Sequence, residues 1–202
     1  FDTFLGGTDA NSLIRNGINA ARGSLFNDIL IGSDNNNLNN SSNESFEGWA
    51  GNDLIDGHLG FDTARYDSTF SGQSFGMVGI DVNMASGVVT GRDAIAQAIV
   101  GTDTLRNVEA VRGTNANDIY VATGMIASAT YNAGLTVNAS NAGANGAGAG
   151  FNEFEGLGGD DLITGNGNTR ISFSNSTGSV SVDLAAGIAT GNESVGTDTF
   201  TL

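Results

Sequence analysis

The sequence predicts an all-β protein in which short strands and glycine-rich turns stack into a solenoid. Three observations point to this class. The residues that most often form turns are abundant, with 31 Gly, 24 Asn and 16 Asp among 202 residues. Two nine-residue units stand end to end from Gly48 to Arg65. The order of sequence blocks in the first half also returns in the second half, which is typical of a repeat architecture.

The two nine-residue units read GWAGNDLID and GHLGFDTAR. The glycines let the backbone turn tightly, and the alternating residues after Asp are typical of a short strand with one buried side chain. Both units have Gly at the first and fourth places, Asp at the sixth, and an aliphatic or small residue at the eighth. These places are filled by Gly48, Gly51, Asp53 and Ile55, and then by Gly57, Gly60, Asp62 and Ala64.

The turn half of each unit also suggests an ion site. A tight glycine turn can point several carbonyl oxygens at one spot, and the Asp adds a charged oxygen. Calcium takes six to eight oxygen ligands of these two kinds. No unit can fold alone, because each needs a neighbour to bury its apolar face and complete its ion site. We therefore expect calcium ions along the turns; the alternative is that these Asp residues merely form turns on a solvated surface.

The pattern resembles the nonapeptide G-G-x-G-x-D-x-U-x of the RTX (repeats-in-toxin) family. This resemblance implies a right-handed parallel β-roll or β-helix with Ca²⁺ bound along its Gly/Asp turns. The implied ligands are the acidic place or its replacement, and turn residues whose backbone oxygens face the ion. They are Asp28, Glu44, Gly48, Ala50, Gly51, Asp53, Gly57, Leu59, Gly60, Asp62, Asp118, Asn152, Gly156, Gly158, Gly159 and Asp161.

Weaker copies of the unit flank the central pair, each with an acidic or amide residue near the sixth place. One of them, Asn39 to Glu47, could instead be part of a disordered asparagine-rich loop. We favour a worn repeat, because Asn tolerates the left-handed backbone where Gly usually sits. The flanking copies are Gly23 to Ile31 with Asp28, Asn39 to Glu47 with Glu44, Gly113 to Val121 with Asp118, Ala147 to Glu155 with Asn152, and Gly156 to Thr164 with Asp161.

The segments between these units do not follow the nine-residue pattern. Met77 to Gly91 alternates in hydrophobicity around a turn, which predicts a β-hairpin or two solenoid strands. Arg92 to Val100 is the only stretch with helical composition, and it predicts one short helix or a decorated loop. Asn132 to Gly150 is rich in Gly, Ala and Asn and predicts an inserted loop.

The second half replays the first at a spacing of 90 to 110 residues. FEGWAGNDLIDG returns as FEGLGGDDLITG, IDVNMASGVVTG as VSVDLAAGIATG, and GTDTL as GTDTF. We therefore divide the chain into two repeat units, residues 1–111 and 112–202, within one continuous solenoid. The unit that begins at Gly165 has no Asp where Asp62 stood, and Thr169 is its best match. The second copy is therefore expected to bind fewer ions, or to bind them more weakly.

Composition excludes several functional classes. The net charge is −15, there is no Cys, and all seven basic residues are Arg, so no basic patch can neutralise nucleic acid. Such an acidic chain repels itself and either stays disordered or recruits cations to fold. No apolar run approaches the roughly 20 residues of a membrane-spanning helix. Residues 1–10 lack the features of a signal peptide, and we expect the chain to be a fragment of a longer protein.

The remaining notable residues suggest structural roles. His58 and Trp49 stand where the family motif has Gly; we expect an exposed turn residue and a ring packed over a turn, although an exposed Trp could also stack on a sugar. Arg22 and Arg112 precede equivalent glycines and are expected to pair with acidic neighbours. Asp103 and Asp198 in the GTDT phrase are expected to be turn or capping residues, with calcium ligation as the alternative. These residues are Arg22, Trp49, His58, Asp103, Arg112 and Asp198.

Together these features predict a calcium-binding structural region that folds outside the cell. The resemblance implies a large bacterial parent, exported by a type I (one-step) system, and the repeats suggest a cell-surface adhesin or S-layer protein. We expect no enzymatic activity, since no motif sets a nucleophile beside His58. The expected partners are calcium ions, other copies of the repeat or cell-surface glycans. The alternatives are the folding and secretion module of an exported enzyme, or a calcium-dependent glycan-binding module.

Overall fold

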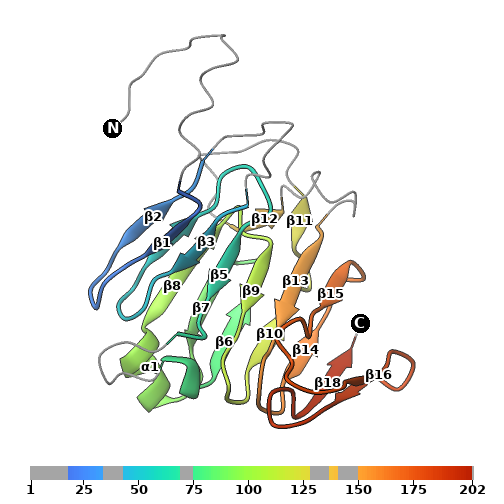
Figure 1. The fold of residues 1–202 in the computed structure, drawn as a ribbon. Helices are drawn as coiled ribbons and strands as arrows, with labels where there is room; N and C mark the ends of the chain where they lie inside the picture. Colours follow the sequence, from blue (N-terminus) through green and yellow to red (C-terminus); the bar gives the residue numbers. More distant parts are fainter. Residues whose placement is uncertain (1–17, 34–42, 69–74, 128–136, 141–149, 202) are drawn as a thin grey trace.

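The computed structural model shows a mostly β protein with two long sheets and one short helix (Figure 1). It describes residues 18–33, 43–68, 75–127, 137–140 and 150–201. The predicted all-β class is therefore confirmed at this coarse level. The asparagine tract at 34–42 and most of the insertion predicted at 132–150 lie outside the described residues.

One sheet has six strands, and every pair of neighbours in it is parallel. Its members are three or four residues long, as the nine-residue unit predicts. Their order across the sheet is β1 (Ala20–Arg22), β3 (Ser45–Glu47), β5 (Thr63–Arg65), β9 (Ala110–Arg112), β13 (Asn152–Glu155) and β15 (Thr169–Ile171).

The second sheet has ten strands and is mainly parallel, apart from two antiparallel excursions. Across the sheet lie β2 (Ile29–Ile31), β4 (Leu54–Asp56), β8 (Thr102–Arg106), β7 (Val88–Gly91), β6 (Ile80–Asn83), β10 (Ile119–Val121), β14 (Leu162–Thr164), β18 (Thr197–Thr201), β17 (Ile188–Thr190) and β16 (Ser181–Asp183). A small third sheet pairs β11 (Ile126–Ala127) with β12 (Ala139–Ser140), so part of the predicted insertion is a strand.

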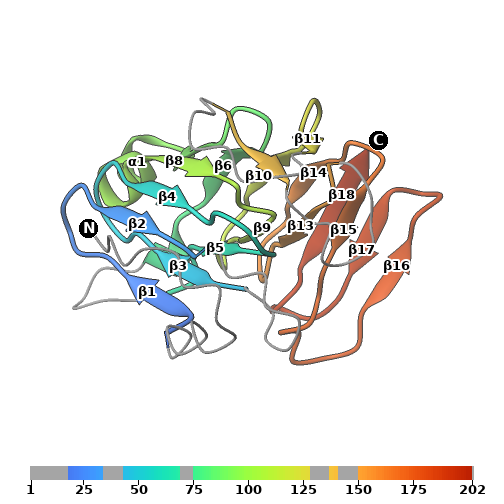
Figure 2. The same cartoon turned by 90° about the horizontal axis from the view of Figure 1, so that it is seen from above.

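The core lies between the two long sheets, which form facing layers in Figure 2. Every predicted eighth-place side chain of the described units points into it or packs against it. Tyr120 and Phe154 stack with ring centroids 4.7 Å apart. The contributing eighth-place residues are Leu30, Phe46, Ile55, Ala64, Tyr120, Phe154 and Ile163. Burial of one apolar side chain per unit thus explains why strands this short are stable only when stacked.

The predicted hairpin and short helix are both present. β6 and β7 pair antiparallel around a turn, and α1 (Ala94–Val100) follows with Asp93 as its N-cap. The 3-10 turn η2 (Phe75–Met77) precedes the hairpin. In the part of the chain that the structure describes, no helix is long and apolar enough to cross a membrane.

The internal repeat is visible in the strand registers. In the first copy Val82 lies opposite Val89, which lies opposite Asp103. In the second copy Val182 lies opposite Ala189, which lies opposite Asp198. The boundary predicted between residues 111 and 112 falls inside β9, so the two copies share both long sheets.

Candidate metal centre

Acidic residues from successive units form rows at the N-terminal edges of the parallel strands. We call the first row acid row one: Asp28, Asp53 and Asp103. The backbone N–H of Asp28 donates to Asp53 Oδ1 at 2.8 Å, and the N–H of Asp53 donates to Asp103 Oδ1 at 2.9 Å. Tyr66 closes the row by donating its hydroxyl to Asp103 Oδ2 at 2.9 Å. A shallow pocket of about 360 Å³ lies over β2, β4 and β8 and is lined in part by Asp28 and Asp53.

The second copy repeats this arrangement as acid row two: Asp118, Asp161 and Asp198. The N–H of Asp118 donates to Asp161 Oδ1 at 2.9 Å, and the N–H of Asp161 donates to Asp198 Oδ1 at 3.0 Å. Asp118 in turn accepts the N–H of Ile80 at 2.8 Å, which ties the second copy to the first. Each carboxylate thus caps a neighbouring strand, so these side chains are part of the sheet edge.

Acid row three lies at the edge of the six-stranded sheet and consists of Glu44, Asp62 and Glu109. The N–H of Glu44 donates to Asp62 Oδ1 at 2.7 Å, and the N–H of Asp62 donates to Glu109 Oε2 at 2.9 Å. Asp53 and Asp62, which are adjacent in the repeat, therefore belong to different sheets and different rows. In the second copy this row continues only with neutral residues, because Asn152 and Thr169 occupy the corresponding places.

The rows leave several carboxylate oxygens buried without a hydrogen-bond donor. These orphan oxygens are Glu44 Oε2, Asp53 Oδ2, Asp62 Oδ2 and Asp161 Oδ2. The residues themselves are 9% exposed or less. A buried carboxylate oxygen with no donor or cation is costly, and such groups are rare in folded proteins.

Two of these oxygens converge with a backbone carbonyl above a glycine. A Cβ placed on Gly57 would collide with both Asp62 Oδ2 and the carbonyl oxygen of Asn107. A Cβ placed on Gly32 would collide with the carbonyl oxygen of Gly57 and lie 3.1 Å from Glu44 Oε2. We call these two places the row-three cradles. Each brings a carboxylate oxygen and a carbonyl oxygen close together beside a glycine Cα, and oxygens of these two kinds suit a hard cation.

The charges of the rows are strongly perturbed by burial. Burial raises the pKa of Asp62 to about 9, and the neighbouring carboxylates of Glu109 and Glu44 raise it as well. The same desolvation raises the pKa of Asp161 to about 9, of Asp103 to about 8, of Asp118 to about 7, and of Asp53 and Asp198 to about 6. Without a bound cation, ionising these groups lowers the stability of the folded state.

The glycine places have a clear backbone basis. The first-place glycines Gly48 and Gly156 have no room for a Cβ, because the Asp carboxylate five residues later occupies that space. The second place has a left-handed backbone: Trp49, His58 and Leu157 have φ values of 73°, 64° and 71°. The motif's second Gly is thus replaced by residues that accept strain there. The fourth-place glycines also have positive φ; they are Gly51, Gly60 and Gly159.

The other predicted carbonyl ligands lie in the turns but not all face a carboxylate. The carbonyl oxygens of Gly51 and Gly159 lie against Gly101 and Gly196 of the following block. Ala50, Leu59 and Gly158 lie in the turns of the same units. Among the described residues, no group of three or more His, Cys, Asp or Glu side chains is close enough to hold a metal ion by itself. A calcium site among the described residues would therefore need other oxygens, such as backbone carbonyls, beside one or two carboxylates.

Some residues differ from the sequence-based predictions. The repeat Asp residues do not lie on a solvated surface, because Asp53, Asp62, Asp118 and Asp161 are 2% exposed or less. Asp103 and Asp198 cap neighbouring strands, as one of their predicted roles requires, but they lie within β8 and β18 and not in turns. Glu109 was not predicted at all. A search for acidic residues directly before an x-apolar-x strand would have identified Asp103, Glu109 and Asp198. That position, and not the glycine spacing, defines membership of a row.

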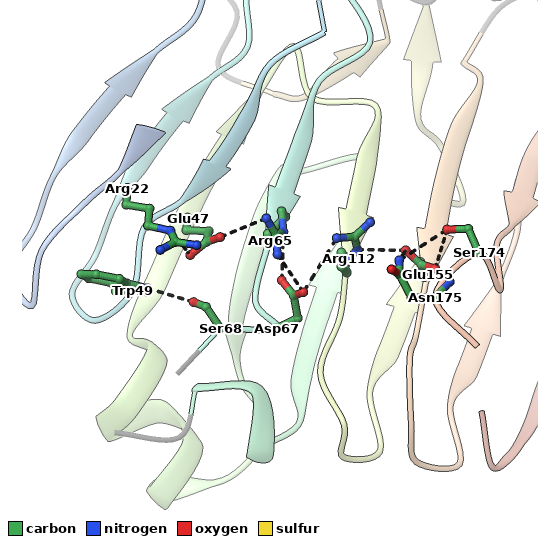
Figure 3. Close-up of polar contacts among 10 residues, drawn as sticks. All are labelled: Arg22, Glu47, Trp49, Arg65, Asp67, Ser68, Arg112, Glu155, Ser174 and Asn175. Atoms are coloured by element: carbon green, nitrogen blue, oxygen red, sulfur yellow. Dashed lines mark hydrogen bonds and ion pairs between the residues drawn. The ribbon is translucent and has the colours of Figure 1, made fainter. Parts of the chain in front are cut away.

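The outer face of the six-stranded sheet carries a separate line of ion pairs (Figure 3). Arg22 Nε lies 2.9 Å from Glu47, and Arg112 Nε lies 2.9 Å from Glu155, so the predicted pairing of both arginines is confirmed. Arg65 contacts both Glu47 and Asp67. Hydrogen bonds from Ser174 and Asn175, with Arg112, lower the pKa of Glu155 although burial opposes them.

The two residues that replace motif glycines are also held in place. The Trp49 indole N–H donates to Ser68 Oγ at 2.9 Å, which ties the turn to the segment after β5 (Figure 3). His58 is partly buried, not exposed as predicted, and its backbone N–H donates to Asp56 Oδ1 at 3.3 Å. Neither residue lies in an acid row.

No family model and no curated protein matches this chain.

Proposed function

We propose that this chain is a calcium-binding structural repeat region, built as a right-handed parallel β-roll or β-helix that folds on calcium outside the cell. The alternation of short parallel strands between two facing sheets supports the solenoid. The three acid rows, which run perpendicular to the strands, support the ion sites. The RTX-like nonapeptide remains the basis for assigning the ion as calcium.

The observation that carries the proposal is the pair of row-three cradles. At each one an orphan carboxylate oxygen and a backbone carbonyl oxygen face the same space. Two oxygens with full or partial negative charge repel each other when they lie near one place, and burial amplifies that repulsion. A calcium ion would relieve it, because calcium accepts carboxylate and carbonyl oxygens at variable geometry. Asp62 with the Asn107 carbonyl, and Glu44 with the Gly57 carbonyl, are the residues that would hold it.

Acid rows one and two supply the next candidates. Asp53 and Asp161 each keep one orphan oxygen, and each lies in the best-matched nonapeptide of its copy. Their other oxygens accept strand N–H groups, so an ion bound at the free oxygen would join the turn to the sheet edge. Binding and folding would then be coupled, since the sites exist only when neighbouring units are stacked.

The acidic composition determines where the chain would be folded and where it would be unfolded. With a net charge of −15, the unfolded chain gains by staying expanded, whereas the stacked chain brings carboxylates together. A chain of this kind would remain unfolded where calcium is scarce and fold where calcium is plentiful. That behaviour suits a secreted or surface-attached bacterial protein exported through a narrow channel. The tandem copies suit an array in an adhesin or S-layer protein, with no catalytic role for this segment.

A calcium titration tests the proposal. We expect chelator to lower the far-ultraviolet β signal or the melting temperature of the chain, and calcium to restore it at about 10⁻⁴ to 10⁻³ M, as in extracellular modules. Magnesium should restore much less, because it demands a regular octahedral site and keeps its waters. A melting temperature that is the same in chelator and in calcium would refute the proposal.

A further inference from the structure

The turn before β15 carries an asparagine that is followed directly by glycine, Asn166-Gly167. The chain contains two other such pairs, at residues 16–17 and 145–146, and both lie outside the described residues. An asparagine in this setting can lose its side-chain amide without an enzyme, because the backbone nitrogen of the next residue is near enough to attack it. Glycine favours the attack, since it has no side chain to shield that nitrogen.

The side-chain oxygen of Asn166 is held by two hydrogen-bond donors. The N–H of Asn168 donates to Asn166 Oδ1 at 2.9 Å, and the Thr169 hydroxyl donates to the same oxygen at 3.1 Å. Two donors on a carbonyl oxygen draw electron density away from its carbon. They also lie where negative charge develops when a nucleophile attacks that carbon, which is the arrangement of an oxyanion hole. The turn therefore activates the Asn166 amide as an electrophile.

The nucleophile is available and the amide is fixed in place. In the part of the chain that the structure describes, no residue accepts a hydrogen bond from the Gly167 N–H. The other end of the Asn166 amide is anchored as well, because its Nδ2 donates to the Gly150 carbonyl oxygen at 2.8 Å. An amide held at both its oxygen and its nitrogen loses less freedom when a ring closes on it.

A similar pair in the first copy lacks these features. Asp56 also precedes a glycine, but the Gly57 N–H is committed to the sheet edge, where it donates to the Arg106 carbonyl at 2.9 Å. The Asp56 carboxyl is held by the Asn107 side chain, which donates to its Oδ1 at 2.8 Å. A carboxylate is also a poorer electrophile than an amide. The first copy therefore supplies an internal control for the turn before β15.

We propose that Asn166 is a site of spontaneous deamidation in the folded chain. The Gly167 nitrogen bonds to Cγ of Asn166, the bond from Cγ to Nδ2 breaks, and the proton of the Gly167 N–H leaves with Nδ2 as ammonia. The product is a cyclic succinimide. Water then opens the ring at either of its carbonyl carbons and gives aspartate or isoaspartate at position 166. The chain gains water and loses ammonia, so no oxidant, metal or second molecule takes part.

The reaction changes how the turn is tied to its neighbour. The Gly150 carbonyl oxygen accepts Nδ2 of both Asn152 and Asn166, each at 2.8 Å. In the aspartate product an oxygen replaces one of these donors, because an ionised carboxyl only accepts. The new carboxylate and the carbonyl then repel each other, and the bond from the turn to the start of β13 is lost. Isoaspartate also adds a carbon to the main chain of the turn, so both products weaken the seating of β15.

Peptide mapping by mass spectrometry tests the proposal. The folded chain is incubated at mildly alkaline pH and digested at mildly acidic pH, which stops further conversion, and the aspartate and isoaspartate at position 166 are followed with time. We expect both products to accumulate at position 166, and we expect no isoaspartate at position 56. Circular dichroism of the same samples verifies that the chain is folded while it reacts.

Two changes at Thr169 test whether the turn activates the amide. Thr169→Val removes one donor to Asn166 Oδ1, and we expect conversion about tenfold slower, a smaller effect than the 10²- to 10³-fold cost of losing an oxyanion donor in an enzyme. Thr169→Ser keeps the hydroxyl and should convert at the rate of the unmodified chain. Gly167→Ala should also slow the reaction, because its Cβ shields the nitrogen although it would meet no other atom within 4 Å.

The product mimic Asn166→Asp should melt at a lower temperature than the unmodified chain, because it contains the repelling oxygen pair from the start. A position 166 that remains asparagine in the folded chain would overturn the proposal, whether or not the other two Asn-Gly pairs convert. A folded Thr169→Val chain that converts as fast as the unmodified chain, or faster, would also overturn it, since the hydrogen bonds of the turn would then protect the amide.

Discussion

The two copies of the repeat agree at one edge of the molecule and differ at the other. Acid rows one and two correspond residue for residue, because Asp28, Asp53 and Asp103 are matched by Asp118, Asp161 and Asp198 with equivalent N–H donations. Row three has no acidic counterpart in the second copy. The strand register is thus retained where the charge is lost, which separates the part of the motif that places the strands from the part that suits a cation.

Thr169 shows this separation most clearly. It occupies the place of Asp62, and its hydroxyl lies over Gly165 as the Asp62 carboxylate lies over Gly57. The hydroxyl accepts the N–H of Asn166 and donates to the Asn166 side chain, so it both donates and accepts a hydrogen bond within the turn. The turn before β15, which is one residue shorter than the turn before β5, therefore does not require an acid. The orphan oxygen of Asp62 is the feature that turn formation leaves unexplained.

The largest effect is expected from Asp62→Asn. This change keeps the shape of the side chain but removes the charge from the row-three cradle. In chelator near pH 8 the variant should melt higher than the unmodified chain, by about 3 °C or more, because folding no longer requires this carboxyl, whose pKa burial raises to about 9, to take up a proton. In calcium it should gain less stability than the unmodified chain does.

The control for this change is Glu193→Gln, which removes one charge from an exposed position outside the rows. It should leave both the melting temperature and the calcium response unchanged. If Asp62→Asn responded to calcium as fully as Glu193→Gln, row three would be a hydrogen-bonded turn edge and not an ion site.

The next effect is a pH dependence that calcium reverses. Burial raises the pKa of Asp62 and Asp161 to about 9, and of Asp53 to about 6, above the ordinary value of 3.8. The folded state therefore binds protons more tightly than the unfolded state. Stability from these groups is full below about pH 4 and is lost as the pH rises through about 6 to 9.

Chelated protein should consequently melt at lower temperature as the pH rises across this window. Saturating calcium should flatten or invert that slope, because it favours the ionised carboxylates. Thermal melts in chelator and in calcium, at matched ionic strength, measure both slopes. Parallel slopes in the two conditions would show that calcium and these protons do not compete.

A gain of function would sharpen the comparison between copies. Thr169→Asp places the acid of the first copy at the same strand register, in a turn that is one residue shorter. We expect the chelated variant to be less stable than the unmodified chain and the calcium-bound variant to recover that loss. Isothermal titration should detect additional calcium uptake. A variant that is destabilised equally in both conditions would mean that carbonyl oxygens suited to an ion are missing beside Gly165.

The smallest effect concerns the strained second place of the nonapeptide. Leu157 has φ of 71°, where a residue other than Gly costs about 1 kcal/mol or more. Leu157→Gly should therefore stabilise the chain by up to about 1 kcal/mol, after the lost side-chain contacts are subtracted. Leu162→Gly, at an extended position in β14, should instead destabilise it. Chemical denaturation of both variants measures the difference, and equal destabilisation would contradict the role of the left-handed backbone.

Much of the fold could be predicted because the nonapeptide assigns each residue one place. The sixth-place Asp residues lie at the strand edges and the eighth-place residues lie in the core, as predicted. One buried side chain per unit leaves little choice of strand register. Thr169 was also matched correctly to Asp62, as the strand register shows, although the turn before it has lost one residue. The antiparallel excursion of β6 and β7 followed from its alternating hydrophobicity.

The membership of the acid rows could not be predicted from spacing alone. Asp103 and Glu109 follow long insertions, so the nine-residue count is lost before them, and only the stacking of strands brings them beside Asp53 and Asp62. Their burial could not be predicted from the sequence either, because Asp in a turn motif is ordinarily exposed. The orphan oxygens depend on which N–H groups the adjacent strand offers, a property of register and not of sequence.

The most direct test of the central claim is a crystal structure of this chain grown with calcium and recorded at a wavelength that gives anomalous signal from calcium. The account predicts anomalous density between the Asp62 carboxylate and the Asn107 carbonyl, with a second peak between Glu44 and the Gly57 carbonyl. It predicts no peak beside Thr169. Peaks absent from both row-three cradles, or a peak beside Thr169 as strong as those beside Asp62 and Glu44, would contradict it.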